Sequence, residues 1–189
     1  MAFLSDLWLP ILLSAVFVFV VSSILHMALP FHKGDCKPLP GEEGVLDALR
    51  AAGVQPGEYM FPGAECMKDM GTPEMRAKFQ RGPVGMMTVM PNGPINMGRS
   101  LAQWFVFSLV ISVFCGYLAT ALLPHGAEYL AVFRLTGTVA VLAYGVSHVP
   151  DSIWKGVSWS ITAKFLLDGV IYGLVTAGTF GWLWPSAAL

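Results

Sequence analysis

Four long runs of apolar residues dominate the chain, and one polar segment, residues 30–99, separates the first run from the second. The runs cover residues 7–29, 101–123, 129–149 and 157–184. A hydrocarbon core about 30 Å thick is crossed by roughly 20 residues of α-helix. Because lipid offers no hydrogen-bond partners, backbone groups that cross it must be paired internally, as they are in a helix. The pattern therefore predicts an all-α integral membrane protein with four transmembrane helices.

The polar segment between the first two runs has the pattern of a small folded domain with mixed, irregular structure. The stretch EEGVLDALRAAG predicts an amphipathic helix that ends at Gly53, a residue suited to the left-handed backbone of a C-cap. Thr72 followed by Pro73 predicts the start of a second helix. Residues 84–98 are apolar around a Pro-Asn-Gly-Pro turn, so we expect them to lie against the membrane surface or the helix ends.

Composition agrees with a membrane setting. Of the 189 residues, 55% are hydrophobic and 12% are charged, whereas a soluble domain has about 25% charged residues. Aromatic rings such as Trp104 fall near predicted span ends, where they settle at the level of the lipid headgroups. A net charge of -1 without a dense basic cluster gives no surface for nucleic acid. The expected partners are the lipid bilayer and either another membrane protein or a second copy of the chain.

Lysine and arginine are distributed unevenly about the four runs. Eight of them lie in the polar domain: Lys33, Lys37, Arg50, Lys68, Arg76, Lys78, Arg81 and Arg99. Lys155 falls on the same side, whereas the N-terminal tail, the turn at 124–128 and the C-terminal tail have none. Positively charged loops stay in the cytoplasm, so we expect a cytoplasmic polar domain and both chain ends outside.

The three cysteines do not have the spacing of a zinc motif. Cys115 lies inside a predicted span, and Cys36 and Cys66 lie in the polar domain. The latter two could form a disulfide only if that domain faced an oxidising compartment.

Three charged residues within predicted spans form the first candidate site: Arg134, Lys164 and Asp168. Ionisable side chains are costly in lipid and mark functional sites by default. Lys164 and Asp168 lie on one face of a helix because they are four residues apart, so they can pair, and Arg134 of the preceding span could meet Asp168. The set predicts either a pathway for a proton or small solute, or a structural ion pair that fixes the helices in register.

A second candidate site consists of histidines near the cytoplasmic ends of the spans. His26, His32 and His148, with Asp151 nearby, offer imidazole and carboxylate ligands for zinc, iron or copper. His26 ends the first span and His148 the third, so closing the bundle could bring them together. No short-range ligand motif such as HxxxH is present, and histidines also occur at membrane interfaces as ordinary amphipathic residues.

The sequence ECMKDM in the polar domain is a third candidate. Cys66, Met67 and Met70 provide the thiolate and thioether ligands that suit Cu(I). The alternative is that methionine serves as a flexible apolar filler in an irregular core.

Small residues recur every four positions along the fourth predicted span, at Gly169, Gly173, Ala177 and Gly181. Such a stripe lets the backbones of two membrane helices approach closely. We expect it to pack against the second or third span of the same chain, or against the fourth span of a neighbouring copy.

No catalytic motif or cofactor-binding motif is recognisable, so no catalytic residue and no cofactor is assigned. The segments HMALPFHKGD, RGPVG, VFRLTGT, SIWKG and DGVIYGLVTAGTFGWLWP resemble a group of bacterial inner-membrane proteins to which no activity is attached. The resemblance implies a bacterial inner-membrane location.

The leading hypothesis is a non-catalytic accessory or assembly subunit, or a small homo-oligomer. The alternatives are a transporter that uses Asp168, Lys164 and Arg134, and a membrane protein that binds copper or zinc.

Overall fold

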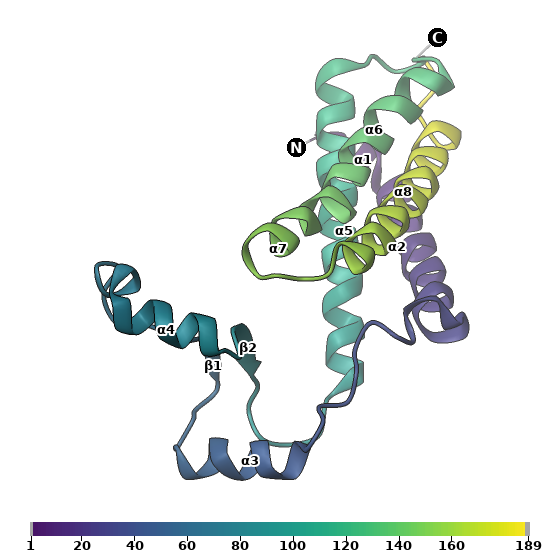
Figure 1. Ribbon diagram of the computed structural model, residues 1–189. Coiled ribbons are helices and arrows are strands. Elements are labelled where there is room, and N and C mark those ends of the chain that lie inside the picture. The colour runs from purple at the N-terminus through teal and green to yellow at the C-terminus, as the bar shows by residue number, and fades with distance from the viewer. Residues whose placement is uncertain (1, 188–189) are drawn as a thin grey trace. The chain divides into compact units, whose positions relative to one another are not determined.

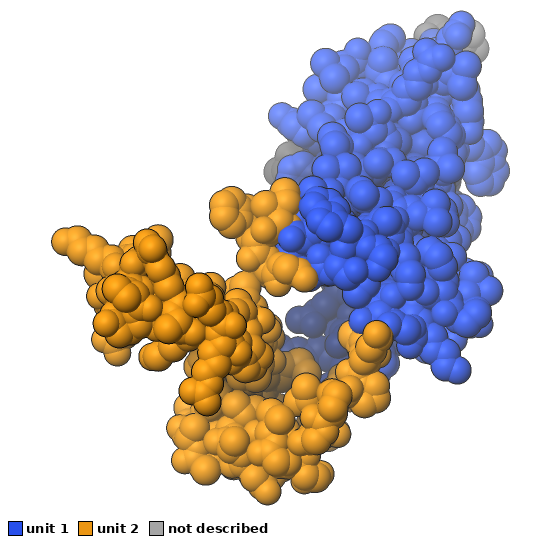
Figure 2. All heavy atoms as spheres, in the orientation of Figure 1, with its two compact units in different colours: residues 1–35, 96–152, 157–189 blue, residues 36–95, 153–156 orange. Residues whose placement is uncertain are grey.

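A computed structural model describes residues 2–187 of the chain (Figure 1). The chain divides into two compact units, which Figure 2 shows in different colours. The membrane unit comprises residues 1–35, 96–152 and 157–189, and the polar unit comprises residues 36–95 and 153–156.

Within the described residues, four helices are long and apolar enough to cross a membrane. They are Trp8–Ala28, Met97–Leu122, Tyr129–Trp154 and Trp159–Trp182. The prediction of an all-α membrane protein with four spans is therefore confirmed, and each end differs from the predicted boundary by only a few residues.

The four spans are built from the following elements. The short helix α1 (Ala2–Asp6) precedes α2 (Trp8–Ser23), which continues as the π-helical turn η1 (Ile24–Ala28); α5 is Met97–Leu122; α6 (Tyr129–Tyr144) continues through the 3-10 turn η4 (Val146–His148) into α7 (Val149–Trp154); α8 is Trp159–Trp182. Helix α8 packs against α6 and α2, and α5 packs against α2 and α6.

The small-residue stripe of α8 packs against α6 of the same chain. A Cβ atom added to Gly169 would lie 2.3 Å from the Cα atom of Gly145, and one added to Gly173 would lie 2.4 Å from Cγ2 of Val141. At the other end of the stripe, a Cβ atom on Gly181 would lie 2.6 Å from the Tyr129 ring. The two backbones can approach this closely only because these positions have no side chain.

The polar unit contains helices α3 (Glu42–Ala51) and α4 (Pro73–Arg81), with the 3-10 turn η3 (Asp69–Gly71) before α4. Both helices agree with the sequence pattern: Gly53 after α3 has φ of 67°, and the Thr72 side chain accepts a hydrogen bond from the Met75 amide as the N-cap of α4.

A two-stranded sheet in the polar unit was not predicted. Strand β1 (Gly57–Phe61) pairs antiparallel with β2 (Gly85–Val89), with Tyr59 opposite Met87. The segment GMMTV, interpreted as part of an apolar surface segment, therefore belongs to a strand. Methionine and glycine have no preference for extended structure, and the pairing depends on a second strand more than twenty residues away. All three cysteines are free, so Cys36 and Cys66 are not paired.

Candidate metal centre

The segment of residues 24–35 places two histidines beside each other at the end of the first span. Its π-helical turn η1 (Ile24–Ala28) carries His26, and turns of this kind occur frequently at functional sites. Leu29 is extended, as the residue before a proline usually is. The proline then begins the 3-10 turn η2 (Pro30–His32), which brings the chain back so that the His26 and His32 rings stack with their centroids 4.1 Å apart.

Asp168 approaches these histidines from α8. Its side chain is only 2% exposed, although it lies within a membrane span. The neighbouring Gly169 holds α8 against the backbone of Gly145, the residue that follows α6, and α8 also packs against α2. The position of the carboxylate is therefore determined by the packing of three helices.

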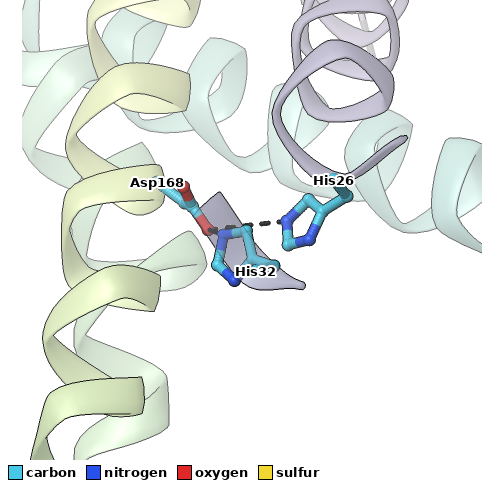
Figure 3. A group of neighbouring side chains, drawn as sticks. All are labelled: His26, His32 and Asp168. Atoms are coloured by element: carbon cyan, nitrogen blue, oxygen red, sulfur yellow. Dashed lines mark ion pairs between the residues drawn. The ribbon is translucent and has the colours of Figure 1, made fainter. Parts of the chain in front are cut away.

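Figure 3 shows the side chains of His26, His32 and Asp168 converging. The Nε2 atom of His32 lies 2.9 Å from Oδ2 of Asp168, and the Nε2 atom of His26 lies 3.4 Å from the same oxygen. One ligand-type atom from each of the three residues lies within 4.8 Å of the other two. In residues 2–187, this is the group of histidine, cysteine and acidic side chains close enough to share a metal ion.

The contact between His32 and Asp168 is short, but it does not have hydrogen-bond geometry. Neither the His32 Nε2 atom nor either carboxylate oxygen of Asp168 has a hydrogen-bond partner in the described part of the chain. A buried carboxylate without hydrogen bonds is expensive, because it has lost its hydration, and the two nearby histidines compensate its charge only when they are protonated. A cation between the imidazole nitrogen and the carboxylate oxygen would compensate both groups.

The second nitrogen of the His32 ring contacts another carboxylate, which selects the tautomer of the neutral imidazole. Nδ1 of His32 lies 2.7 Å from Oδ2 of Asp35. Hydrogen bonds from Lys164 and then from His32 hold the pKa of the Asp35 carboxyl below its usual value, so Asp35 remains a carboxylate and accepts. The proton of a neutral His32 is therefore on Nδ1, and its Nε2 atom offers a lone pair towards Asp168. A metal-ligating histidine commonly has such a carboxylate on its second nitrogen.

Lys164 links the segment that carries His32 and Asp35 to α8. Its Nζ atom donates to the backbone carbonyl of Phe31 at 2.8 Å, forms an ion pair with Asp35 and lies 5.3 Å from the centre of the Phe31 ring. Lys164 and Asp168 are one turn apart on α8, so both contact the segment that carries His32. The expected pairing of these two α8 residues with each other is replaced by pairing with a different part of the chain.

Arg134 lies outside the cluster, and among the described residues Asp168 contacts His26 and His32 instead. The α6 residue beside Gly169 is Tyr144, which follows Arg134 by ten residues. At about 1.5 Å per residue, that separation is about 15 Å along the helix. The Arg134 side chain is exposed on the surface of the membrane unit.

His148 lies beside the cluster but outside the group of candidate ligands. Its ring stacks on Phe165 with the centroids 4.6 Å apart, and the His32 ring lies 5.5 Å from the same phenyl group. Phe165 therefore contacts both imidazoles, and His148 is not within ligand distance of the group. Asp151 follows in α7 and is not part of the group either.

Cys66, Met67 and Met70 belong to the polar unit. Cys66 is exposed and the Met67 side chain is 86% exposed, whereas Met70 is half-buried. The His26–His32–Asp168 group in the membrane unit contains no sulfur ligand.

Metal binding by all three residues requires a small movement of His26. Two ligand atoms bound at 2.0–2.2 Å to one tetrahedral ion lie about 3.3–3.6 Å apart, so the 3.4 Å separation fits and the 2.9 Å separation must lengthen slightly. The planes of the two stacked imidazoles differ by only 19°, however, so their in-plane lone pairs do not meet at one point. The His26 side chain is 36% exposed, which leaves it room to rotate.

One contributor to the site, Asp35, was missed in the sequence, as were the partners of two others. Asp35 follows His32 by three residues in HKGD, and this spacing was an available signal for a carboxylate that orients a histidine. Lys164 was recognised as a buried charge, but its partner lies 129 residues earlier. Trp104 was named only as a ring near a span end, and the structure adds that its indole donates a hydrogen bond to Ser22 at 2.8 Å.

No protein-family model, curated protein or solved structure matches this chain.

Proposed function

We propose that this multi-pass membrane protein binds one divalent transition-metal ion through His26, His32 and Asp168. The observation that carries the proposal is the buried Asp168 carboxylate, whose two oxygens have no hydrogen-bond partner although Nε2 of His32 lies 2.9 Å away. Two imidazoles and one carboxylate suit zinc or ferrous iron, and the absence of sulfur from the group disfavours Cu(I). Three protein ligands leave at least one coordination position open, as in catalytic and transport sites.

The proposed location is the inner membrane of a bacterium, with the polar domain in the cytoplasm and both chain ends outside. The excess of Lys and Arg in residues 30–99 supports this orientation, as does their absence from the opposite loops. The metal centre would then lie at the cytoplasmic end of the bundle, because His26 ends the span that leads into the polar domain.

A homo-oligomer built through the fourth span receives less support than metal binding. Gly169 and Gly173 are in contact with α6 of the same chain, so this part of the stripe is not available to a neighbouring copy. A transport pathway that uses both Arg134 and Asp168 is also disfavoured, because Arg134 lies far along α6 from the level of Asp168.

Elemental analysis tests the proposal directly. The protein is purified in a mild detergent with a tag that contains no histidine, and it is then loaded with zinc, ferrous iron or manganese and dialysed. We expect about one equivalent of one of these metals, and loss of this equivalent in His32→Ala. His125→Ala is the matched control, because His125 lies 45% exposed in the loop before α6. Substoichiometric metal in all three preparations, or full metal in His32→Ala, would overturn the proposal.

Asp35→Asn is expected to weaken metal binding without removing it. The amide no longer favours the Nδ1–H form of His32, and loss of such an orienting carboxylate lowers affinity by about 10- to 100-fold. Competition with a chromophoric chelator measures this affinity. Asp47→Asn is the control, because Asp47 is an exposed carboxylate paired with Arg50 on α3. Equal affinity in wild type and Asp35→Asn, with unchanged thermal stability, would contradict the orienting role.

A further inference from the structure

A cavity of about 460 Å³ lies next to the proposed metal centre, within the membrane unit. All four spans contribute to its wall, and Asp168 and His26 form part of its lining. A volume of this size is within the range of small-molecule sites. An open coordination position on a metal held by these two residues would face the cavity.

The walls of the cavity are mainly apolar and aromatic. Trp104 of α5, Tyr144 of α6 and Tyr172 of α8 come together, with ring centroids 5.5 Å apart for the two tyrosines and 6.1 Å apart for Trp104 and Tyr172. A strongly polar ligand would lose its hydration here without replacement. An apolar chain, by contrast, would gain contacts with these rings.

One polar atom on the wall has no partner. The side chain of Tyr172 is 3% exposed, and its hydroxyl makes no hydrogen bond within residues 2–187. A buried hydroxyl without a partner is costly. An oxygen atom of a ligand would accept a hydrogen bond from it. Tyr172 lies one helical turn after Asp168, so the same ligand head could also approach the metal.

The cavity opens at the end of the bundle, not in its middle. Its exposed lining residues include Met27 and Met97, at 69% and 57% exposure. Met27 lies in the last turn of the first span and Met97 begins the second span. The opening is therefore at the depth of the lipid headgroups, where amphiphiles place their polar ends.

We infer that the cavity binds an acyl amphiphile, with its apolar chain against the aromatic wall. The oxygen of its carboxyl or ester head completes the metal coordination and accepts a hydrogen bond from Tyr172. This inference rests on the proposed metal site and adds the class of ligand to it. No covalent change in the ligand is involved.

The test uses full-length protein in nanodiscs, loaded with Co²⁺, whose visible absorption reports directly on ligands that reach the metal. Acetohydroxamic and octanohydroxamic acids are the probes, because they share a metal-binding head and differ only in the apolar chain. We expect octanohydroxamate to bind at least about 30-fold more tightly, since each buried methylene adds affinity. Equal affinity of the two probes would overturn the inference while leaving the metal site intact. Failure to bind Co²⁺ would instead overturn the proposed function.

A blocking variant separates cavity binding from simple partition into the lipid. Ser100→Trp places a large side chain on the lining of the cavity near its opening, and Val110→Trp is the control on the lipid-exposed part of α5. The chain-length preference should fall below about 3-fold in Ser100→Trp and persist in Val110→Trp. A preference that survives in both variants would show that the chain lies in lipid, and would overturn the inference.

Tyr172→Phe tests the hydrogen bond. We expect about 10-fold weaker binding of both hydroxamates with unchanged Co²⁺ affinity; Tyr117→Phe, at an exposed tyrosine of α5, should have no effect. Unchanged hydroxamate binding in Tyr172→Phe would remove Tyr172 from the ligand site.

Decanoic acid and its methyl ester then serve as competitors. Displacement by the acid alone identifies a free carboxylate as the ligand head, displacement by both identifies an ester lipid, and displacement by neither overturns the acyl class.

Discussion

Asp168→Ala is expected to lower the affinity for the metal by at least about 100-fold. The loss of a carboxylate that only orients a ligand costs about 10- to 100-fold, and the loss of a ligand itself should cost more. The same substitution should leave the metal-free protein as stable as the wild type, or more stable. The reason is that the wild-type carboxylate is 2% exposed and has no hydrogen-bond partner, so alanine removes a desolvation cost and no hydrogen bond. Calorimetry with and without metal measures both effects.

The sign of the stability change in metal-free Asp168→Ala distinguishes a metal site from a structural ion pair. In wild type, metal at 100 times its Kd should stabilise the fold by about 2.7 kcal/mol, and this gain should vanish in Asp168→Ala. Asp6→Asn is the control, since Asp6 is a 41% exposed carboxylate at the end of α1. If Asp168 instead served as the structural partner of a protonated His32, its removal would lower the stability of the metal-free protein by several kcal/mol. That result would contradict the metal assignment.

Gly169→Leu is expected to prevent the bundle from forming correctly. Already the Cβ atom would lie 2.3 and 2.4 Å from backbone atoms of Gly145, and a backbone cannot move aside as a side chain can. We expect little monodisperse protein and no metal in what remains. Gly169→Ala, the milder change, should cost at least about 2 kcal/mol, because overpacking cannot be relieved by a rotamer change.

Gly178→Ala is the matched control on the same helix. The nearest atom to an added Cβ at Gly178 is the Tyr129 hydroxyl oxygen at 3.8 Å, an ordinary contact. This variant should retain wild-type stability and metal content. Thermal unfolding in detergent and elemental analysis measure both quantities. Wild-type stability in Gly169→Leu would show that α6 and α8 do not depend on this close approach.

Several local features could be predicted because their causes are local in sequence. Thr72 caps α4 through its own side chain, and Gly53 follows α3 with the positive φ expected of it. The strand β2 could not be predicted in this way. Its stability depends on pairing with β1, and its sequence GMMTV has only two residues that favour extended structure.

The candidate site was predicted in parts that belonged to separate hypotheses. His26 and His32 were considered with His148 as metal ligands, and Asp168 was considered with Arg134 as an ion pair. The tertiary structure regroups them, because α8 packs against both α2 and α6. The His148 ring stacks on Phe165 and is not one of the grouped ligands, and about 15 Å of helix separates Arg134 from the level of Asp168.

The sequence by itself determined the four membrane spans and the presence of a polar domain after the first of them. It could do so because the cost of an unpaired backbone in lipid depends only on the local run of residues. Only the tertiary structure decided which buried charge meets which histidine, and that the glycine stripe of α8 contacts α6. These outcomes depend on the rotation and register of one helix against another. For the metal ligands they are set by contacts between residues more than a hundred positions apart. For the stripe they are set by the close approach of the backbones at Gly145 and Gly169.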